Sequence, residues 1–390
     1  MTQLKPGVTV ALACGGTGGH LFPGLAVAQE LAERGARLVL FVSPKEIDQQ
    51  GLAASRHRFT VVTLPQVALT RRGFAGFLRG TWQGYRQSVR EFKSLRPAAV
   101  LAMGGFTAAA PVLAGRRVGA RIFLHESNAV PGRANVWLGR LADLGFAGMT
   151  DAVSQWRVRR VCVTGTPVRP EIRLAEQGAS RRAQGLAEDR PVLLVTGGSQ
   201  GAHGVNQLFL ACLPELAQTF PGLQLVHLTG SADFKEVSET YRRAGIPALI
   251  RPFSNQMDQL LAAATVVVSR SGASSLAELA ARRLPSVLIP YPSAAGDHQR
   301  RNAEVFVRIG AARMVDQTVS DGSVLGRSLL GLLESESTRD QMAAALARLD
   351  RPQAAAEIAE LICRQLGERW GTESAVSLSP GRAFAGGQAG

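Results

Sequence analysis

The fold is decided by residues 8–20, VTVALAC followed by GGTGGH, and the pattern returns at residues 191–201, PVLLVT followed by GGSQG. In each copy a short apolar run leads into a glycine loop, and the loop leads into a helix-forming stretch. The first turn of a helix has backbone N–H groups without helical partners, so it can bind an anion. Glycine lets the backbone turn tightly and come close to a phosphate. The two copies predict two nucleotide-fold domains that face one cleft.

Length and composition agree with two domains. The chain has 390 residues, of which 46% are hydrophobic, and its 42 glycines suit an α/β protein with many tight loops. The formal net charge is +14. Such a basic excess points to nucleic acid, an anionic membrane surface or phosphorylated substrates, or it reflects a surface on which arginine is simply common. Charge alone leaves these interpretations open.

The cysteines and the apolar segments argue against several classes of protein. Cys14, Cys162, Cys212 and Cys363 are far apart and lack the spacing of a zinc site or a disulfide framework, which suits a reducing compartment. The apolar run 8–14 is too short for the core of a signal peptide. No stretch approaches the roughly 18 apolar residues of a membrane span. We therefore expect a soluble protein, or one bound to a membrane only at its surface.

Apolar runs alternate with helix-forming stretches along the chain, which predicts parallel sheets of the α/β class. The expected strands are 8–14, 37–43, 59–64, 98–103 and 121–125 in the first half, and 191–196, 223–228, 248–251, 265–268 and 286–289 in the second. The expected helices include 23–34, 75–95 and 340–368. We predict domains at 1–165 and 166–345, joined by a polar linker that starts near Gly165, and a disordered tail at 371–390.

The first glycine loop is not a known dinucleotide or ATP motif. Leu21 stands where the GxGxxG pattern needs its third glycine, and the Gly-Lys-Ser/Thr of a Walker loop is absent. Four glycines with Thr17 and His20 favour a cradle for a phosphate or a sugar over a merely tight turn. A helix N-terminus disfavours the charged form of His20, so a neutral imidazole there could act as a base. His20 could equally serve only to position the loop.

Two polar segments follow predicted strands in the second half. SRSGASSLAE at 269–278 supplies hydroxyls, a glycine turn and Glu278, whose carboxylate could accept both hydroxyls of a ribose; the same residues could instead cap a helix. Asp297-His298-Gln299 and Asn302 form a second polar cluster, a weak signal for sugar binding. No Asp-x-Asp pair is present, so we expect no metal-binding residues.

Residues 67–96 mix seven basic side chains with Phe74, Phe77, Trp82 and Tyr85 at helical spacing. A basic and aromatic helix suits an anionic membrane interface. The alternative is an ordinary amphipathic helix whose aromatic side chains face the core. Glycines at 73 and 76 favour the membrane interpretation slightly, because they make this region adaptable.

Taken together, the motifs resemble the bacterial MurG glycosyltransferases, in order over about residues 8–345. The resemblance rests on GGTGGH at 15–20, MGGF at 103–106, HESN at 125–128, TGTPVR at 164–169, GGSQGA at 197–202, SRSGASSLAE at 269–278, and DHQ at 297–299 with Asn302. Each motif is weak by itself, whereas the ordered set is highly specific. Ser127, Thr166 and Ser254 depart from residues that are frequent in the family, and we expect these departures to affect fine specificity more than the reaction.

The resemblance implies the GT-B fold: two Rossmann-like, doubly wound parallel-sheet domains around a cleft, with a C-terminal helix at about 346–368 that packs back on the first domain. It implies an inverting hexosyltransferase without a cofactor, which moves N-acetylglucosamine from UDP-N-acetylglucosamine to lipid I (undecaprenyl-diphospho-N-acetylmuramyl-pentapeptide) and makes the peptidoglycan precursor lipid II. It also implies a peripheral protein on the cytoplasmic face of the inner membrane, with other cell-wall synthesis and division proteins as candidate partners and no nucleic acid.

The resemblance also assigns site residues by motif position. His20 is the expected base. The residues expected to bind UDP-N-acetylglucosamine are Thr17, Gly18, Gly19, Asn128, Arg169, Ser199, Ser254, Ala273, Ser274, Ser275, Glu278 and Gln299. The residues expected to bind the acceptor are Gly15, Gly16, Gly104, Gly105, His125, Glu126 and Asn135. The rival interpretations are another GT-B enzyme, such as a diacylglycerol glycosyltransferase or a UDP-sugar epimerase, and more distantly a basic nucleic-acid-binding protein.

Overall fold

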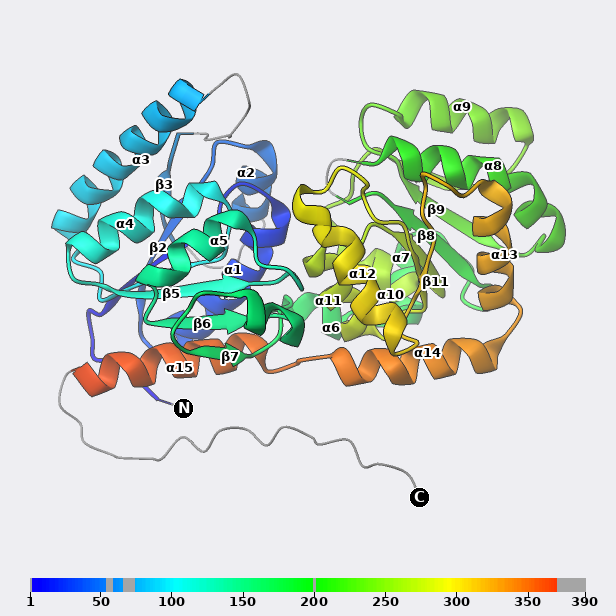
Figure 1. Cartoon of the computed structure of the whole chain (residues 1–390). Coiled ribbons are helices and arrows are strands. Elements are labelled where there is room, and N and C mark those ends of the chain that lie inside the picture. Colours follow the sequence, from blue (N-terminus) through cyan, green and yellow to red (C-terminus); the bar gives the residue numbers. More distant parts are fainter. Residues whose placement is uncertain (1, 54–58, 66–73, 199–200, 370–390) are drawn as a thin grey trace.

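The computed structural model describes residues 2–53, 59–65, 74–198 and 201–369 and contains two parallel sheets, each covered by helices. Figure 1 shows the two halves side by side, and we call them the first and second lobes. The basic-aromatic residues 67–73, Ser199 and the predicted tail 371–390 lie outside the described residues.

The first lobe has a seven-stranded sheet in the order β3-β2-β1-β4-β5-β6-β7, in which every pairing is parallel. Its strands are β1 (Thr9–Ala13), β2 (Arg37–Val42), β3 (Thr60–Thr63), β4 (Ala99–Ala102), β5 (Arg121–Glu126), β6 (Leu144–Ala147) and β7 (Val161–Val163). Its helices are α1 (Gly18–Glu33), α2 (Glu46–Ala53), α3 (Phe74–Leu95), α4 (Ala109–Arg117) and α5 (Arg133–Leu138). Two buried clusters cover the two faces of this sheet, as a doubly wound fold requires.

The second lobe has a six-stranded parallel sheet in the order β10-β9-β8-β11-β12-β13. Its strands are β8 (Val192–Thr196), β9 (Gln224–Leu228), β10 (Leu249–Arg251), β11 (Val266–Ser269), β12 (Ser286–Leu288) and β13 (Arg313–Met314). Its helices are α6 (Pro170–Leu174), α7 (Gln177–Ala183), α8 (His203–Thr219), α9 (Phe234–Ala244), α10 (Met257–Ala263), α11 (Ala273–Arg282), α12 (His298–Arg308), α13 (Gly322–Leu333) and α14 (Glu336–Leu349). One continuous cluster of buried residues forms its core.

The predicted helix over 340–368 is two helices, α14 and α15 (Ala354–Arg369), separated by four residues that include Pro352. Proline has no N–H for an intrahelical bond and clashes with the preceding turn, so the helix ends before it. The break lets the chain change lobes. Leu346 belongs to the core of the second lobe, whereas Ile358 and Ile362 are buried in the first lobe, where α15 lies against α1. Figure 1 shows α15 running beneath the first lobe.

The strands that sequence periodicity missed are β6, β7 and β13, which have four, three and two residues; β7 and β13 are edge strands and β6 lies next to β7. Helix α1 was predicted from Pro23 onward, but it begins at Gly18 with Thr17 as its N-cap residue, and Pro23 lies inside it. This earlier start brings His20 into the first turn of the helix.

Both sheets reverse their strand order at one place, between β1 and β4 and between β8 and β11. Ligands of such sheets bind outside the carboxyl ends of the strands at this switch point. The two glycine loops directly follow β1 and β8. A Cβ on Gly15 would lie 2.4 Å from the backbone nitrogen of Ser43, and a Cβ on Gly197 would lie 2.4 Å from that of Ala202. Only glycine therefore fits where each loop turns.

Candidate functional site

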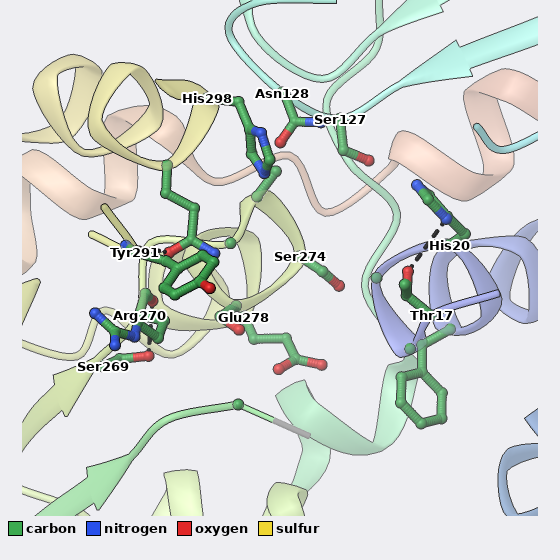
Figure 2. Close-up of a pocket in the computed structure, with 18 of the residues that line it drawn as sticks. Thr17, His20, Ser127, Asn128, Ser269, Arg270, Ser274, Glu278, Tyr291 and His298 are labelled. Carbon is green, nitrogen blue, oxygen red and sulfur yellow. Dashed lines mark hydrogen bonds between the residues drawn. The ribbon is translucent and has the colours of Figure 1, made fainter. Parts of the chain in front are cut away.

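A cleft of about 1170 Å³ lies between the lobes and is lined by loops from both of them. From the first lobe come the loops after β1, β4 and β5, and from the second lobe come the loops after β8, β10, β11 and β12. The N-termini of α1 and α11 meet here: a Cβ on Gly19 would lie 3.9 Å from the Cβ of Ser274. Figure 2 shows Thr17 and His20 facing Ser274 and Glu278 across this space.

The first glycine loop is fixed by two side chains near the start of α2. The Oδ2 of the buried Asp48 accepts the backbone N–H of Gly16 at 2.8 Å and the hydroxyl of Ser43 at 2.6 Å. The ammonium group of Lys45 donates to the carbonyl oxygen of Gly16 at 2.8 Å. With both backbone groups of Gly16 held in this way, the first turn of α1 is presented to the cleft in one conformation.

The imidazole of His20 lies over the glycines of the loop after β4. A Cβ on Gly104 would lie 3.0 Å from Nε2 of His20, and a Cβ on Gly105 would lie 3.2 Å from its Cε1. The Nδ1 atom is 3.1 Å from the hydroxyl oxygen of Thr17. Burial lowers the pKa of His20, and this effect outweighs the carboxylates of Glu126 and Asp48, which raise it. The imidazole is therefore neutral at pH 7 and able to accept a proton.

The segment after β5 is organised by the buried Glu126. Its Oε1 accepts the backbone N–H and the side-chain N–H of Asn128 at 3.0 and 2.8 Å. Its Oε2 accepts the N–H of Gly132 at 2.8 Å and the side-chain N–H of Asn135 at 2.9 Å. Four hydrogen bonds compensate the desolvated carboxylate and bend the segment around it. Glu126 thus places Asn128 in the cleft.

His125 is not among the residues that line the cleft. It joins β5 to Gly165, where the polar linker between the two lobes begins. Its Nε2 is 3.1 Å from the carbonyl oxygen of Gly165 and its Nδ1 is 3.3 Å from the hydroxyl of Ser127. Burial lowers the pKa of His125 to about 4. With both ring nitrogens occupied inside the protein, the geometry gives His125 a structural position.

Three side chains link the lobes along the lining of the cleft. The guanidinium of Arg169, at the entrance to α6, lies over the ring of Phe22 at 4.1 Å from its centroid. Its Nη2 is 3.6 Å from Oε1 of Glu278 on α11. Burial raises the pKa of Glu278, while Arg169 acts in the opposite direction. Phe22 follows His20 closely on α1, so this arrangement connects the first turn of α1 with α11 through an aromatic–cation contact and an ion pair.

Most of the predicted site residues meet in the cleft. Those that line it are Thr17, Gly18, Gly19, His20, Gly104, Gly105, Glu126, Asn128, Asn135, Arg169, Ser254, Ala273, Ser274, Ser275, Glu278 and Gln299. Gly15, Gly16 and His125 are not among the lining residues, because they support the loops from behind. The cleft is also lined by residues that were not among the predicted site residues, Phe22, Arg270, Tyr291, His298 and Gln317. Arg270 and His298 stood inside motifs already noted, whereas nothing in the sequence marked Phe22 or Gln317.

Within the described part of the chain, no group of three or more His, Cys, Asp or Glu side chains could hold a metal ion. In the same part, no helix is both long enough and apolar enough to cross a bilayer. Helix α3 is amphipathic instead: the side chains of Leu78 and Trp82 are 51% and 59% exposed, and the ring of Trp82 stacks on Tyr85 at 5.7 Å. Helix α5 exposes 63% of Trp137. Several arginines flank these apolar side chains, including Arg79, Arg86, Arg90 and Arg133.

Comparison with known proteins places both lobes in one family of sugar transferases. Residues 10–145 match the Glycosyltransferase family 28 N-terminal domain and residues 192–360 match the Glycosyltransferase family 28 C-terminal domain. A protein of Anaeromyxobacter sp. (strain K) is 36% identical over 95% of this chain and 96% of its own length. One of Pelobacter propionicus is 38% identical over 87% of this chain and 95% of its own length. Both are named UDP-N-acetylglucosamine–N-acetylmuramyl-(pentapeptide) pyrophosphoryl-undecaprenol N-acetylglucosamine transferase.

Solved structures give the same result for the fold. The crystal structure of Acinetobacter baumannii MurG superposes with a TM-score of 0.70 at 25% identity and covers 92% of this chain and all of its own. A UDP-GlcNAc 2-epimerase from Neisseria meningitidis also reaches a TM-score of 0.70, at 14% identity, which shows a shared fold alone. The predicted GT-B architecture, two Rossmann-like domains facing a cleft, is confirmed.

Proposed function

Because the chain belongs to the family of UDP-N-acetylglucosamine–N-acetylmuramyl-(pentapeptide) pyrophosphoryl-undecaprenol N-acetylglucosamine transferases, we propose that it is a glycosyltransferase that moves N-acetylglucosamine from UDP-N-acetylglucosamine to lipid I and forms lipid II. The observation that carries this function is the cleft in which the N-termini of α1 and α11 converge from opposite lobes. Two helix N-termini stabilise anions, and this reaction has a diphosphate both on its leaving group and on its acceptor.

We place the donor against the second lobe. The amides of Ala273, Ser274 and Ser275 in the first turn of α11 suit the diphosphate, and the carboxylate of Glu278 suits two ribose hydroxyls. Ser254 lies buried after β10, where its backbone can frame the uracil, and Arg169 lies between the lobes beside Glu278. Ser199 belongs to the same proposal from its motif alone. Helix dipoles and hydroxyls would then meet the charge of departing UDP without a metal.

We place the acceptor against the first lobe and the transferred sugar between the lobes, where Gln299 lines the cleft from the second lobe. Inversion needs a single displacement, in which the acceptor hydroxyl loses its proton and attacks the anomeric carbon as UDP leaves. His20 is neutral, faces the cleft and is held against Gly104 and Gly105, which supports it as the base. The first-turn residues Gly18 and Gly19 adjoin it and suit the acceptor diphosphate or the sugar.

We further propose that the first lobe rests on an anionic membrane surface through α3, α4 and α5. Lipid I is anchored by its undecaprenyl chain, so an enzyme that uses it must work at a bilayer. The exposed side chains of Leu78, Trp82 and Trp137 lie on α3 and α5, and α4 contacts both helices. Apolar side chains surrounded by arginine bind at an interface without crossing it. This surface of the first lobe would bind the cytoplasmic face of the inner membrane.

The deciding experiment mixes the purified protein with UDP-N-acetylglucosamine and a short-chain analogue of lipid I and follows release of UDP. We expect release only when both substrates are present, and a product larger than the acceptor by one N-acetylhexosamine. Transfer to diacylglycerol, or conversion of the donor to its 2-epimer without an acceptor, would support one of the rival GT-B functions. The epimerase alternative is the weaker one, since the epimerases match this chain in fold alone.

A further inference from the structure

Arg270 is a buried cation in the cleft, and within the described part of the chain its hydrogen bonds go to carbonyl and amide oxygens and to no carboxylate. It directly follows β11, and only 7% of it is exposed. Its Nη1 donates to the carbonyl oxygens of Ile289 and Pro290, both at 3.0 Å, and to Oε1 of Gln317 at 2.7 Å. Burial lowers its pKa to about 10. A guanidinium buried without an acid is costly, so a particular task is expected of it.

The carbonyl groups that Arg270 holds lead directly into the sugar side of the cleft. Tyr291 follows Pro290, and the guanidinium of Arg270 lies 5.5 Å from the centroid of its ring. The backbone N–H of Tyr291 donates to the side chain of Gln299 at 2.9 Å. A backbone N–H can only donate, so the amide oxygen of Gln299 must face it. Gln299 lines the cleft, so its NH₂ group is the hydrogen-bond donor that this side chain can offer there.

On its other side, Arg270 is joined through Gln317 to the first turn of α8. Gln317, which accepts from Arg270, lies against the first turn of α8: a Cβ on Gly204 would be 2.6 Å from its amide nitrogen. Arg270 thus braces the loop after β12, the loop after β13 and the beginning of α8 with one rigid, planar group. Lysine, with a single flexible ammonium, would reproduce this geometry poorly.

We propose that Arg270 is a positioning residue, which fixes the side-chain amide of Gln299 so that its NH₂ group faces the transferred sugar. The protein would then select a sugar that has a hydroxyl oxygen placed to accept a hydrogen bond from this group. The inference rests on the proposed donor site. It assigns to Arg270 no contact with the substrate, and it predicts an effect on the sugar but not on the nucleotide.

The first test compares Arg270→Lys with Arg282→Lys. Arg282 is a matched control, because its Nη1 also donates to two carbonyl groups, those of Arg173 and Ala175, its pKa is also lowered by burial, and it lies outside the cleft. We expect Arg270→Lys to raise KM for UDP-N-acetylglucosamine about three- to tenfold, the worth of one hydrogen bond, with Ki for UDP unchanged. Arg282→Lys should change neither.

The proposal would be overturned if Arg270→Lys raised KM for the donor and Ki for UDP equally, or if it raised neither. Unchanged Ki for UDP shows at the same time that the second lobe is folded. If UDP fails to inhibit the wild-type protein, the proposed donor site itself is wrong, and this outcome differs from a loss confined to the sugar.

The second test is a double-mutant cycle that combines substitutions of Arg270 and Gln299. Gln299→Glu keeps an oxygen for the N–H of Tyr291 but presents an acceptor to the sugar, so we expect it to raise KM for the donor at least as much as Gln299→Met. If Arg270 acts through Gln299, the double variant Arg270→Lys/Gln299→Met should be no worse than Gln299→Met. Additive losses, or wild-type KM in Gln299→Glu, would refute the assignment.

Discussion

The side-chain amide of Asn302, on α12 of the second lobe, donates to Oδ1 of Asn128, in the first lobe, at 3.0 Å. Asn302 is fully buried, its Oδ1 accepts the N–H of Ala129 at 2.8 Å, and its NH₂ also donates to the carbonyl of Ser271 at 3.1 Å. One side chain therefore holds the loop after β5 against the loop after β11. Because Asn128 lines the cleft, the approach of the two lobes and the placement of this site residue are coupled.

Asn302→Asp should destabilise the protein and slow the reaction. The variant loses both N–H donors and turns a carboxylate toward two oxygen acceptors in a buried position. We expect the free energy of unfolding to fall by about 2–4 kcal/mol, together with a lower kcat at saturating donor. Urea unfolding and initial rates at a temperature below the transition measure the two effects. Wild-type values for both would show that the interlobe bond contributes nothing.

His20→Ala should lower kcat about 10²- to 10⁴-fold, the usual contribution of a general base, with little change in the affinity for UDP. Since burial lowers the pKa of His20, the wild-type rate should stay level as pH falls toward 6.5 and decline only at lower pH, as the imidazole becomes protonated. The variant should lose this acidic limb. Turnover near that of the wild type would remove His20 as the base and leave it a positioning role.

Glu278→Ala should weaken donor binding about tenfold or more, because a charged hydrogen-bond acceptor for ribose is lost. Calorimetry with UDP and with 2′-deoxy-UDP separates ribose recognition from disturbance of Arg169, whose ion pair with Glu278 is also lost. The wild-type protein should prefer UDP, and the variant should bind both ligands alike. An undiminished preference for UDP in the variant would refute the ribose role.

Two buried histidines should make the fold sensitive to acid. Burial lowers the pKa of His125 and of His227 from 6.5 to about 4. Between these pH values the unfolded chain binds more protons than the folded one, so stability is complete above pH 6.5 and is lost as pH falls toward 4. At pH 5 each histidine should cost about 2 kcal/mol. Urea unfolding at pH 7 and pH 5 measures this loss, and His227→Gln should remove about half of it; an unchanged loss would contradict this account.

Leu78→Gln should weaken binding to vesicles that contain phosphatidylglycerol about tenfold, as expected for withdrawing one large apolar side chain from an interface. Leu174→Gln is the matched control, since Leu174 is 79% exposed on α6 of the second lobe. Sedimentation with vesicles measures both variants, and vesicles of phosphatidylcholine alone should bind the wild type poorly. Equal binding of both variants would remove α3 from the interface.

The sequence anticipated the parts of the fold that local rules control. Apolar runs of four or more residues located β1, β2, β4, β5, β8 and β11, because buried parallel strands carry a continuous apolar pattern. The two-residue strand β13 was missed because it is defined by pairing with β12 and not by its own pattern. The division of 340–368 into α14 and α15 follows from Pro352, because proline cannot continue a helix.

For the site, the sequence by itself determined which chemical groups are present and at which strand ends they stand, because glycine loops, caps and motif spacing are local properties of the chain. Only the tertiary structure decided which of these groups share the cleft. It moved His125 to a buried structural position and brought Phe22, Arg169 and Glu278, which are far apart along the chain, into one contact. It also set Asn302 against Asn128. Such contacts depend on how two independently wound sheets pack on each other, and no local pattern in the sequence encodes that packing.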